Sequence, residues 1–372
     1  MDMSFTEEQV AIRELAGKIL ETEVTGARLR EVESGTEWFD RALWSELAKT
    51  DLLGIGIPEE HGGSGGGIVE VCVLLEEVGK AVAPVPVWSA LVLGALPLAR
   101  FGTEEQQREL LPGVVAGEVI LTAALAEPEE DDAAPVLFRA ERDGNSWLLT
   151  GSHAMVPAVH LASRILVPAT TRGDEVGLFL VDPAAEGASA TRQETTTDEP
   201  RFELTLDAAR VSDASVLVAP TANTEAVRWV TDVATVGLCA IQLGVAQRSL
   251  EITASYTSER EQFGRPLGTF QAVQQRLADA YIDVQALRWT TWEAAWRLAQ
   301  GLPVAEHVAV AKFWAAEGGQ RVLASAQHLH GGIGVDVEYP LYRYTRWAKL
   351  GELTLGGAGR HLARLGAEIR VG

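Results

Sequence analysis

The sequence is poor in cysteine and in basic residues. Its 372 residues include only two cysteines, Cys72 and Cys239, which are too few and too far apart for a zinc site or a disulfide framework. This cysteine usage is typical of a cytoplasmic protein. Lysine and arginine together number 31 against 52 aspartates and glutamates, which gives a formal net charge of −21. A chain this acidic is not expected to bind nucleic acid.

The sequence also lacks an uninterrupted apolar run long enough to cross a membrane. Residues 81–99 carry no charge, but Pro84, Pro86 and Pro97 divide them. A membrane-spanning helix needs about 20 consecutive apolar residues. We therefore expect a buried core helix over about residues 87–96 and no membrane span. The N-terminus has neither the basic nor the apolar region of a signal peptide, in keeping with a cytoplasmic location.

The pattern of apolar residues changes twice along the chain. Residues 1–118 and 221–372 show helical spacing, whereas residues 119–220 hold short alternating runs and an Asp-Gly hairpin signal at positions 143–144. The polar, threonine-rich residues 188–200 predict an exposed loop. We expect an α+β chain with an N-terminal helical domain, a middle β-barrel-like domain and a C-terminal four-helix bundle with small residues at its helix contacts.

A corner rich in glycine and proline joins two long helices near the start of the C-terminal part. Gly264, Pro266 and Gly268 separate two helical patterns, and proline cannot continue a helix. Thr269 is the expected N-cap of the second helix, whose apolar stripe begins at Phe270. The sequence therefore predicts a rigid helix–corner–helix unit.

Four side chains around this corner are suited to a large polar cofactor. Arg260 precedes the corner, Phe263 lies in it, and Gln271 and Gln274 lie one turn apart on the second helix. Together they present an arginine, an aromatic ring and two amides from a rigid pair of helices.

These residues, in this order, closely resemble the signature of the acyl-CoA dehydrogenases, flavoenzymes that desaturate an acyl thioester between Cα and Cβ. The resemblance implies that Arg260, Phe263, Gly264, Gln271 and Gln274 reach across a dimer interface to the diphosphate and adenosine end of a neighbour's FAD. A guanidinium offers fork-like donors to diphosphate oxygens, which fits this role. The order of helices, β domain and helical bundle is also that of the family, so the resemblance covers nearly the whole chain.

A second segment resembles the family's Gln-x-x-Gly-Gly segment, which holds the adenosine half of the cofactor. Its glycines match Gly331 and Gly332. His328 occupies the usual glutamine position and Gln327 lies one residue earlier, so either side chain could supply the polar contact. No metal site is expected here, because His328 and His330 should point to different faces near the end of a helix.

The residues with which a family member holds its own flavin ring do not match. Residues 126–133 read Ala-Glu-Pro-Glu-Glu-Asp-Asp-Ala where the family has Thr-Glu-Pro-x-Ala-Gly-Ser-Asp, and their carboxylates would repel a diphosphate. Residues 155–158 read Met-Val-Pro-Ala in place of the family's Trp-Ile-Thr-Asn. The hydroxyl and amide donors that tune the ring are therefore missing.

Both positions that the family uses for its catalytic glutamate hold apolar residues. In most members the glutamate begins a Glu-Gly-Thr segment, whose match is Leu355-Gly356-Gly357; in others it lies 26 residues before the signature arginine, at the position of Ala234. Abstraction of an α-proton needs a carboxylate within hydrogen-bond reach, and neither side chain provides one. Glu352 could replace the base only in a remodelled loop; otherwise it is a solvated or ion-paired carboxylate.

The sequence keeps the residues that would contact a neighbour's FAD, but it lacks those that would hold the chain's own flavin. Random sequence divergence would change both sets of residues. The resemblance thus implies a non-catalytic subunit of an α2β2 heterotetramer, as in actinobacterial acyl-CoA dehydrogenases of steroid side-chain degradation. The expected partners are a catalytic acyl-CoA dehydrogenase paralogue, a bulky, steroid-derived acyl-CoA and an electron-transfer flavoprotein. Two alternatives remain open: a self-sufficient homotetramer with a relocated base such as Glu352, and a flavin-free structural or assembly protein of the same fold.

Overall fold

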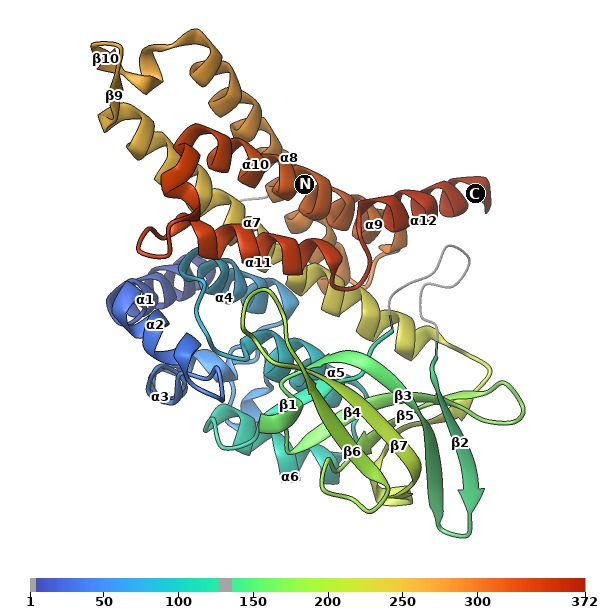
Figure 1. Ribbon diagram of the computed structural model, residues 1–372. Coiled ribbons are helices and arrows are strands. Elements are labelled where there is room, and N and C mark those ends of the chain that lie inside the picture. The colour runs from blue at the N-terminus through green and yellow to red at the C-terminus, as the bar shows by residue number, and fades with distance from the viewer. Residues whose placement is uncertain (1–4, 127–135, 372) are drawn as a thin grey trace. The chain divides into compact units, whose positions relative to one another are not determined.

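The computed structural model of the chain describes residues 5–126 and 136–371 (Figure 1). The predicted order of elements is confirmed, because helices come first, a β-sheet follows, and helices complete the chain. The chain divides into two compact units, one of Met1–Leu29, Cys72–Ala83 and Thr235–Gly372, the other of Arg30–Val71 and Pro84–Ala234. These units differ from the three predicted ranges, so the boundaries near residues 118 and 220 stay a prediction.

Short helices build the N-terminal part of the chain. They are α1 (Glu7–Glu23), α2 (Gly26–Ser34), α3 (Arg41–Lys49), α4 (Ile68–Ala81), a π-helical segment (Trp88–Ala95) that runs into α5 (Leu96–Phe101), and α6 (Glu104–Val115). Capping boxes begin α1 and α6, in which the hydroxyl of Thr6 or Thr103 accepts a hydrogen bond from the third helical N–H. The core helix predicted near residues 87–96 is confirmed, and every residue of Trp88–Ala95 is buried.

The middle of the chain folds into an eight-stranded mixed sheet. Its strands are β1 (Leu121–Ala123), β2 (Phe138–Asp143), β3 (Ser146–Pro157), β4 (Arg164–Thr170), β5 (Val176–Val181), β6 (Ala188–Gln193), β7 (Arg201–Ser212) and β8 (Val216–Thr221). Their order is β6-β7-β3-β2-β4-β5-β8, with β1 paired to β4. The hairpin between β2 and β3 turns at Gly144, whose φ is +60°, as the Asp-Gly pair predicts. Phe138, Leu149 and Phe179 belong to the core of this sheet.

The loop predicted over residues 188–200 is wrong in its first half. Ala188–Gln193 is strand β6, which pairs antiparallel with β7 at the edge of the sheet. Most of its side chains are exposed. An edge strand is held by backbone hydrogen bonds and needs few apolar side chains, so its polar sequence cannot be told from a loop by pattern alone.

Long helices and a small hairpin make up the C-terminal part. The elements are α7 (Glu225–Glu259), β9 (Glu261–Gln262), β10 (Arg265–Pro266), α8 (Gln271–Ala299), α9 (Ala305–Phe313), α10 (Gly319–His330), α11 (Leu341–Leu353) and α12 (Ala358–Val371). Of the described helices, α7 alone is long and apolar enough to cross a membrane, yet 89% of its most apolar 18-residue window is buried inside the protein. The two cysteines, Cys72 and Cys239, are free and buried.

Two glycines let α4 and α7 pack closely. A Cβ atom on Gly79 would lie 2.1 Å from the carbonyl oxygen of Ile241, and one on Gly244 would lie 1.9 Å from that of Glu76. Only glycine permits such an approach of two backbones. The prediction that small residues of α7 allow close helix packing is thus confirmed at Gly244.

Candidate functional site

The corner that follows α7 is a two-residue β-hairpin. The Arg260 N–H donates to the carbonyl oxygen of Tyr256 at 2.8 Å, which continues the helical bonding past the end of α7 at Glu259. Strands β9 and β10 then pair antiparallel around Phe263 and Gly264, whose φ angles are +56° and +78°. Two successive positive φ angles make the tight hairpin turn that favours glycine. The helix–corner–helix prediction is confirmed.

The N-cap predicted for the second helix is wrong. Thr269 lies in a 3-10 turn, Leu267–Thr269, and its hydroxyl donates to the carbonyl oxygen of Pro266 at 2.7 Å. Phe270 occupies the N-cap position of α8 and makes no side-chain cap. Threonine hydroxyls often bond to a nearby backbone group instead of capping a helix, and here that bond ties the corner together.

Residues 260–274, which we call the arm, carry an exposed aromatic ring beside an exposed arginine. The arm extends away from the other C-terminal helices, at the upper left of Figure 1. The side chain of Phe263 at its tip is 92% exposed, and Arg260 is exposed without an ion-pair partner among the described residues. Phe263 contacts Phe270 edge to face, with ring centroids 6.2 Å apart. An exposed ring beside an exposed guanidinium can contact a ligand that combines an aromatic ring with negative charge.

The two glutamines at the start of α8 differ in their bonding. The Nε2 group of Gln274 donates to the carbonyl oxygen of Gly268 at 3.1 Å, so this amide folds back onto the arm. Gln271, three residues earlier, is exposed. Gln271 is therefore the more open of the two amides toward a ligand.

Gln327 and His328 point to different surroundings at the end of α10. The Nε2 group of Gln327 donates to the carbonyl oxygen of Gly331 at 3.2 Å, and its Oε1 atom is buried with no hydrogen-bond partner among the described residues. His328 is exposed. A Cβ atom on Gly331 or Gly332 would meet nothing within 4 Å, so the backbone there is open to a ligand. Gln327, not His328, lies beside this open backbone.

His330 anchors the glycine segment to α7. Its ring stacks on that of Tyr256 at 4.3 Å between centroids, and its Nε2 atom lies 3.0 Å from the hydroxyl of Tyr339. Burial lowers the pKa of His330 and raises the pKa of Tyr339, so both side chains stay neutral at pH 7. His330 is buried while His328 is exposed, which confirms that they face different ways, and the described residues hold no cluster suited to a metal ion.

This aromatic cluster brings together two predicted groups that the sequence could not connect. Arg260 follows Tyr256 by one helical turn, and Gly331 directly follows His330. The stacked pair therefore fixes the arm and the glycine segment to each other. Sequence reasoning missed Tyr256 and Tyr339, because no spacing rule links residues so far apart in the chain.

Leu355, the first base position, is buried in the turn between α11 and α12. Its side chain is 5% exposed, and it and Gly356 have φ angles of +57° and +90°. The Nε2 atom of His361 lies 2.8 Å from the carbonyl oxygen of Leu355. Burial lowers the pKa of His361 to about 4, so the ring is neutral at pH 7 and its Nε2–H donates to that oxygen. The turn is well held but offers no carboxylate.

Glu352 is an ion-paired residue, which is one of the two roles that the sequence left open for it. Its Oε2 atom lies 2.5 Å from Nζ of Lys349, one turn back on α11. Its main-chain oxygen accepts a hydrogen bond from the fully buried Lys312 at 3.1 Å, and Lys312 also donates to the carbonyl oxygen of Gly351 at 2.6 Å. These bonds fix the last turn of α11 in place.

Ala234, the second base position, is fully buried in α7. Its carbonyl oxygen accepts a hydrogen bond from the indole N–H of Trp88 at 3.0 Å, and the guanidinium of Arg201 lies 6.0 Å from the Trp88 ring centroid. Asp232, the nearest acid in sequence, is buried and already interacts with other groups. Ala234 has no ionisable group, so it cannot accept a proton from a substrate.

Two segments were expected to hold the chain's own flavin ring, and the second of them lies in β3. Residues 127–133 of the acidic loop lie outside the described residues. Met155 lies at a bulge of β3 with a φ of +61°, and its backbone N–H donates to Oε1 of Gln193 at 2.8 Å. Val156 and Ala158 are buried and apolar. The side chains of this segment therefore provide no hydrogen bond to a ring.

The arrangement can bind a cofactor that combines negative charge with an aromatic ring. Arg260 offers charge-assisted donors, Phe263 an exposed ring, Gln271 an open amide, and Gln327 a buried oxygen without a partner beside an open backbone. A dinucleotide such as FAD fits this set of groups. The same residues cannot abstract a proton from carbon.

Comparison with known proteins identifies the family. The model of the acyl-CoA dehydrogenase N-terminal domain matches residues 6–118, and that of the acyl-CoA dehydrogenase C-terminal domain matches residues 224–369. The chain belongs to the acyl-CoA dehydrogenase family, whose fold has an N-terminal helical domain, a middle β-sheet domain and a C-terminal helical domain. Relatives in this family bind FAD.

Several members of the family are similar to this chain over their whole length. Acyl-CoA dehydrogenase FadE27 of Mycobacterium tuberculosis is 39% identical over 99% of both chains, and FadE28 of the same organism is 32% identical over 100% of both. Among solved structures, the ChsE4-ChsE5 complex from Mycobacterium tuberculosis has a TM-score of 0.93 and 39% identity, covering 100% of this chain and 99% of that one. A variant of the Tcur3481-Tcur3483 steroid ACAD has a TM-score of 0.90 and 48% identity over 98% of both chains. Both structures combine two different chains.

Proposed function

We propose that this chain is the non-catalytic subunit of a heteromeric acyl-CoA dehydrogenase. The observation that carries the proposal is the contrast between the arm and the base positions. Arg260 and Phe263 are exposed, and Arg260 has no ion-pair partner among the described residues, whereas Leu355 and Ala234 are buried and apolar. A chain that lends cofactor contacts to a partner but performs no proton abstraction needs this combination. The names of the ChsE4-ChsE5 and Tcur3481-Tcur3483 complexes, each with two different chains, support it.

In the proposed α2β2 assembly, the arm binds the diphosphate and adenosine end of FAD held by a catalytic acyl-CoA dehydrogenase paralogue. Arg260 donates to the diphosphate, Phe263 packs on a ring, and Gln271 and Gln274 orient the same end of the cofactor. Gln327 beside Gly331 and Gly332 contacts the adenosine half. His328 makes this contact only if Gln327 does not. FAD, when bound, supplies the two-electron acceptor for desaturation.

The partner subunit would supply the glutamate that abstracts the α-proton and the pocket for the flavin ring. The substrate is an acyl-CoA with a bulky acyl group, of which a steroid side chain is the example supported by the name of one structural relative. An electron-transfer flavoprotein would then reoxidise the cofactor, and the complex would work in the cytoplasm. The three-domain division at residues 1–118, 119–220 and 221–372 belongs to the same proposal.

The test is the flavin content per chain, measured on the purified chain alone and after co-expression with a catalytic paralogue from the same organism. We expect no flavin in the isolated chain and one FAD per pair of unlike chains in the complex. One FAD per chain in the isolated, active protein would contradict the proposal and point to Glu352 as a relocated base. A complex without flavin would instead favour a structural or assembly role.

A further inference from the structure

Three aromatic rings from three different segments meet beside the arm. Tyr256 lies one turn before the end of α7, His330 at the end of α10, and Tyr339 in the loop before α11. The rings of Tyr256 and His330 stack with an angle of 19° between their planes. The centroid of the Tyr339 ring lies 6.2 Å from that of Tyr256 and 5.2 Å from that of His330. Because each ring contacts the other two, a shift of one segment breaks contacts with both others.

Two hydrogen bonds fix the orientation of the His330 ring. Its Nδ1 atom lies 2.8 Å from the carbonyl oxygen of Ala326, and its Nε2 atom lies 3.0 Å from the hydroxyl oxygen of Tyr339. A carbonyl oxygen can only accept a hydrogen bond, so Nδ1 carries the proton of the neutral ring. The Nε2 atom therefore accepts its bond from the Tyr339 hydroxyl. The ring cannot turn over without losing both bonds.

The bond from Tyr339 closes residues 331–338, which contain the two glycines. The beginning of this segment is held by Gln327, which donates to the carbonyl oxygen of Gly331. Near its end, the N–H of Tyr339 donates to the carbonyl oxygen of Asp336 at 3.0 Å, which is a local turn. The hydroxyl of Tyr339 then ties this turn back to His330 on α10. The open backbone at Gly331 is thus fixed relative to the His330 ring.

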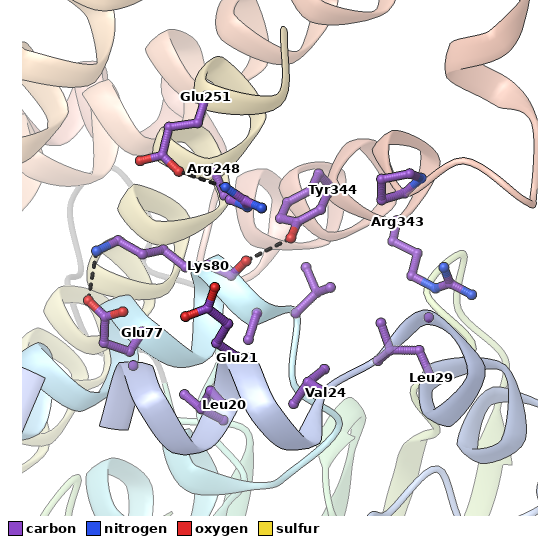
Figure 2. Close-up of a pocket in the computed structure, with 15 residues that line it drawn as sticks. Leu20, Glu21, Val24, Leu29, Glu77, Lys80, Arg248, Glu251, Arg343 and Tyr344 are labelled. Atoms are coloured by element: carbon purple, nitrogen blue, oxygen red, sulfur yellow. Dashed lines mark hydrogen bonds and ion pairs between the residues drawn. The ribbon is translucent and has the colours of Figure 1, made fainter. Parts of the chain in front are cut away.

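The residue that closes the segment is itself anchored through α11. Figure 2 shows Tyr344, near the start of α11, beside Lys80, near the end of α4. The Tyr344 hydroxyl donates to the carbonyl oxygen of Lys80 at 2.7 Å. Burial raises the pKa of Tyr344 to about 12, so the hydroxyl keeps its proton at neutral pH. Because Tyr339 lies directly before the residues that begin α11, this bond also limits the movement of Tyr339.

The same cluster sets the position of the arm. The N–H of Arg260 donates to the carbonyl oxygen of Tyr256 at 2.8 Å, so the backbone of Tyr256 places Arg260. On the other side of the stack, Gly331 directly follows His330. Two contacts to one ligand strengthen each other when their spacing is fixed, because the first contact holds the ligand at a high effective concentration for the second.

We propose that Tyr256, His330 and Tyr339 are positioning residues that fix the distance between Arg260 and the backbone at Gly331. The arm and the glycine segment consequently bind the diphosphate and the adenosine half of one FAD cooperatively. This inference rests on the subunit role proposed above and adds that the two groups of contacts act as one site.

The test is a double-mutant cycle of Arg260→Ala and Gln327→Leu in the co-expressed complex. Equilibrium dialysis against FAD gives the dissociation constant of each variant. The coupling factor is the product of the two single losses of affinity divided by the loss in the double variant. Cooperative contacts predict a coupling factor of about three or more, because either single change already removes the benefit that the other contact provides.

Tyr256→Leu removes the stacked ring and should lower the coupling factor to within about twofold of one. Tyr256→Phe is the matched control, since it keeps the ring and should keep the coupling factor of the wild type. A general loss of stability would weaken FAD binding without changing the coupling factor. The coupling factor therefore separates a positioning role from a purely structural one.

Tyr339→Phe keeps the test decisive if Tyr256→Leu fails to fold. It removes only the hydroxyl that donates to His330 and should lower the coupling factor at least about twofold. The inference is overturned if the two losses multiply in the wild-type complex, or if the coupling factor is unchanged in a folded Tyr256→Leu or Tyr339→Phe complex. Those results would leave the subunit role standing. A complex that holds no FAD at all would instead contradict the subunit role, and this inference with it.

Discussion

The arm and the turn at Leu355 follow helices of the same C-terminal bundle, but they differ in whether their side chains and polar groups have partners inside the chain. The arm leaves the ring of Phe263 and the guanidinium of Arg260 in water, whereas the turn buries Leu355 and bonds its carbonyl oxygen to His361. Polar groups that stabilise the fold have hydrogen-bond partners inside the chain. Groups that remain exposed and unpaired at a fixed place are instead available to a partner. The difference supports the proposal that this chain contributes to catalysis through groups of the arm that contact a partner.

The largest effect is expected at the turn, on lowering the pH. An unfolded histidine has a pKa near 6.5, whereas that of His361 in the folded chain is about 4. Between these values the unfolded chain holds more protons, so the free energy of unfolding falls as the pH drops from about 6.5 to about 4. The loss should total about 3 kcal/mol, with none of it above about pH 6.5. Urea unfolding at a series of pH values measures it.

His361→Gln and His328→Gln separate this histidine from the general effect of acid. His361→Gln should make the pH dependence in that window shallower and leave the part due to the buried His330 and His153, although it lowers stability at neutral pH by removing a buried bond. His328 is exposed, so His328→Gln should keep the slope of the wild type. An unchanged slope in His361→Gln would show that the turn at Leu355 is not held by a neutral histidine.

The next largest effect is expected for Arg260→Ala, which changes FAD binding by the arm in the co-expressed complex. Loss of a charge-assisted contact to the diphosphate should weaken FAD retention about ten- to a hundredfold, because hydrogen bonds to charged groups contribute about 1.5–3 kcal/mol. Flavin release during dialysis, followed by absorbance, measures the change. Stability of the isolated chain should not change, since Arg260 is exposed and has no ion-pair partner among the described residues.

Arg265→Ala is the matched control for this experiment. Arg265 lies on the other strand of the same hairpin, and its guanidinium is 4.1 Å from the centroid of the Phe270 ring. Its removal should change FAD retention less than the removal of Arg260 does. Equal losses in both variants would mean that the arm attracts the cofactor through its total charge and not through Arg260.

The sequence predicted the parts of the molecule that have strong local signals. The order of helices and strands, the hairpin at Gly144, the close packing at Gly244 and the corner at Gly264 all follow from periodicity or from glycine chemistry. Strand β6 was missed because an edge strand with polar side chains has the composition of a loop. Thr269 is not the N-cap because its hydroxyl, which as a cap would accept a hydrogen bond from a backbone N–H, instead donates to the carbonyl oxygen of Pro266.

The candidate site was predicted as separate motifs and not as one site. The stacked pair of Tyr256 and His330 depends on the packing of α7 against α10, which no local pattern encodes. The choice between Gln327 and His328 likewise needed the structure, since only burial distinguishes their surroundings. The bond from His361 to Leu355 was not foreseen, because a histidine six residues along the chain has no characteristic spacing for holding a turn.

A smaller effect should distinguish the two candidates for the adenosine contact. Gln327→Leu keeps the size of the side chain and removes its amide, so it should weaken FAD retention by the complex about fivefold, the value of one neutral hydrogen bond. His328→Leu should leave retention within about twofold. The same dialysis assay applies to both. If His328→Leu has the larger effect, the family's usual glutamine position is the functional one after all, and Gln327 only packs over Gly334.

The smallest effect on activity is expected for Leu355→Ala in the complex. Leu355 occupies the position of the family's usual base but carries no ionisable group, so its truncation should leave α-proton abstraction within about twofold of the wild type. The free energy of unfolding should fall, because removing a buried leucine side chain costs about 2–5 kcal/mol. Turnover of an acyl-CoA with a steroid side chain and urea unfolding, measured on the same preparation, separate the two. A large loss of turnover in a folded Leu355→Ala complex would mean that the turn touches the reacting site of the partner, and the division between an outward-facing arm and an inert turn would no longer hold.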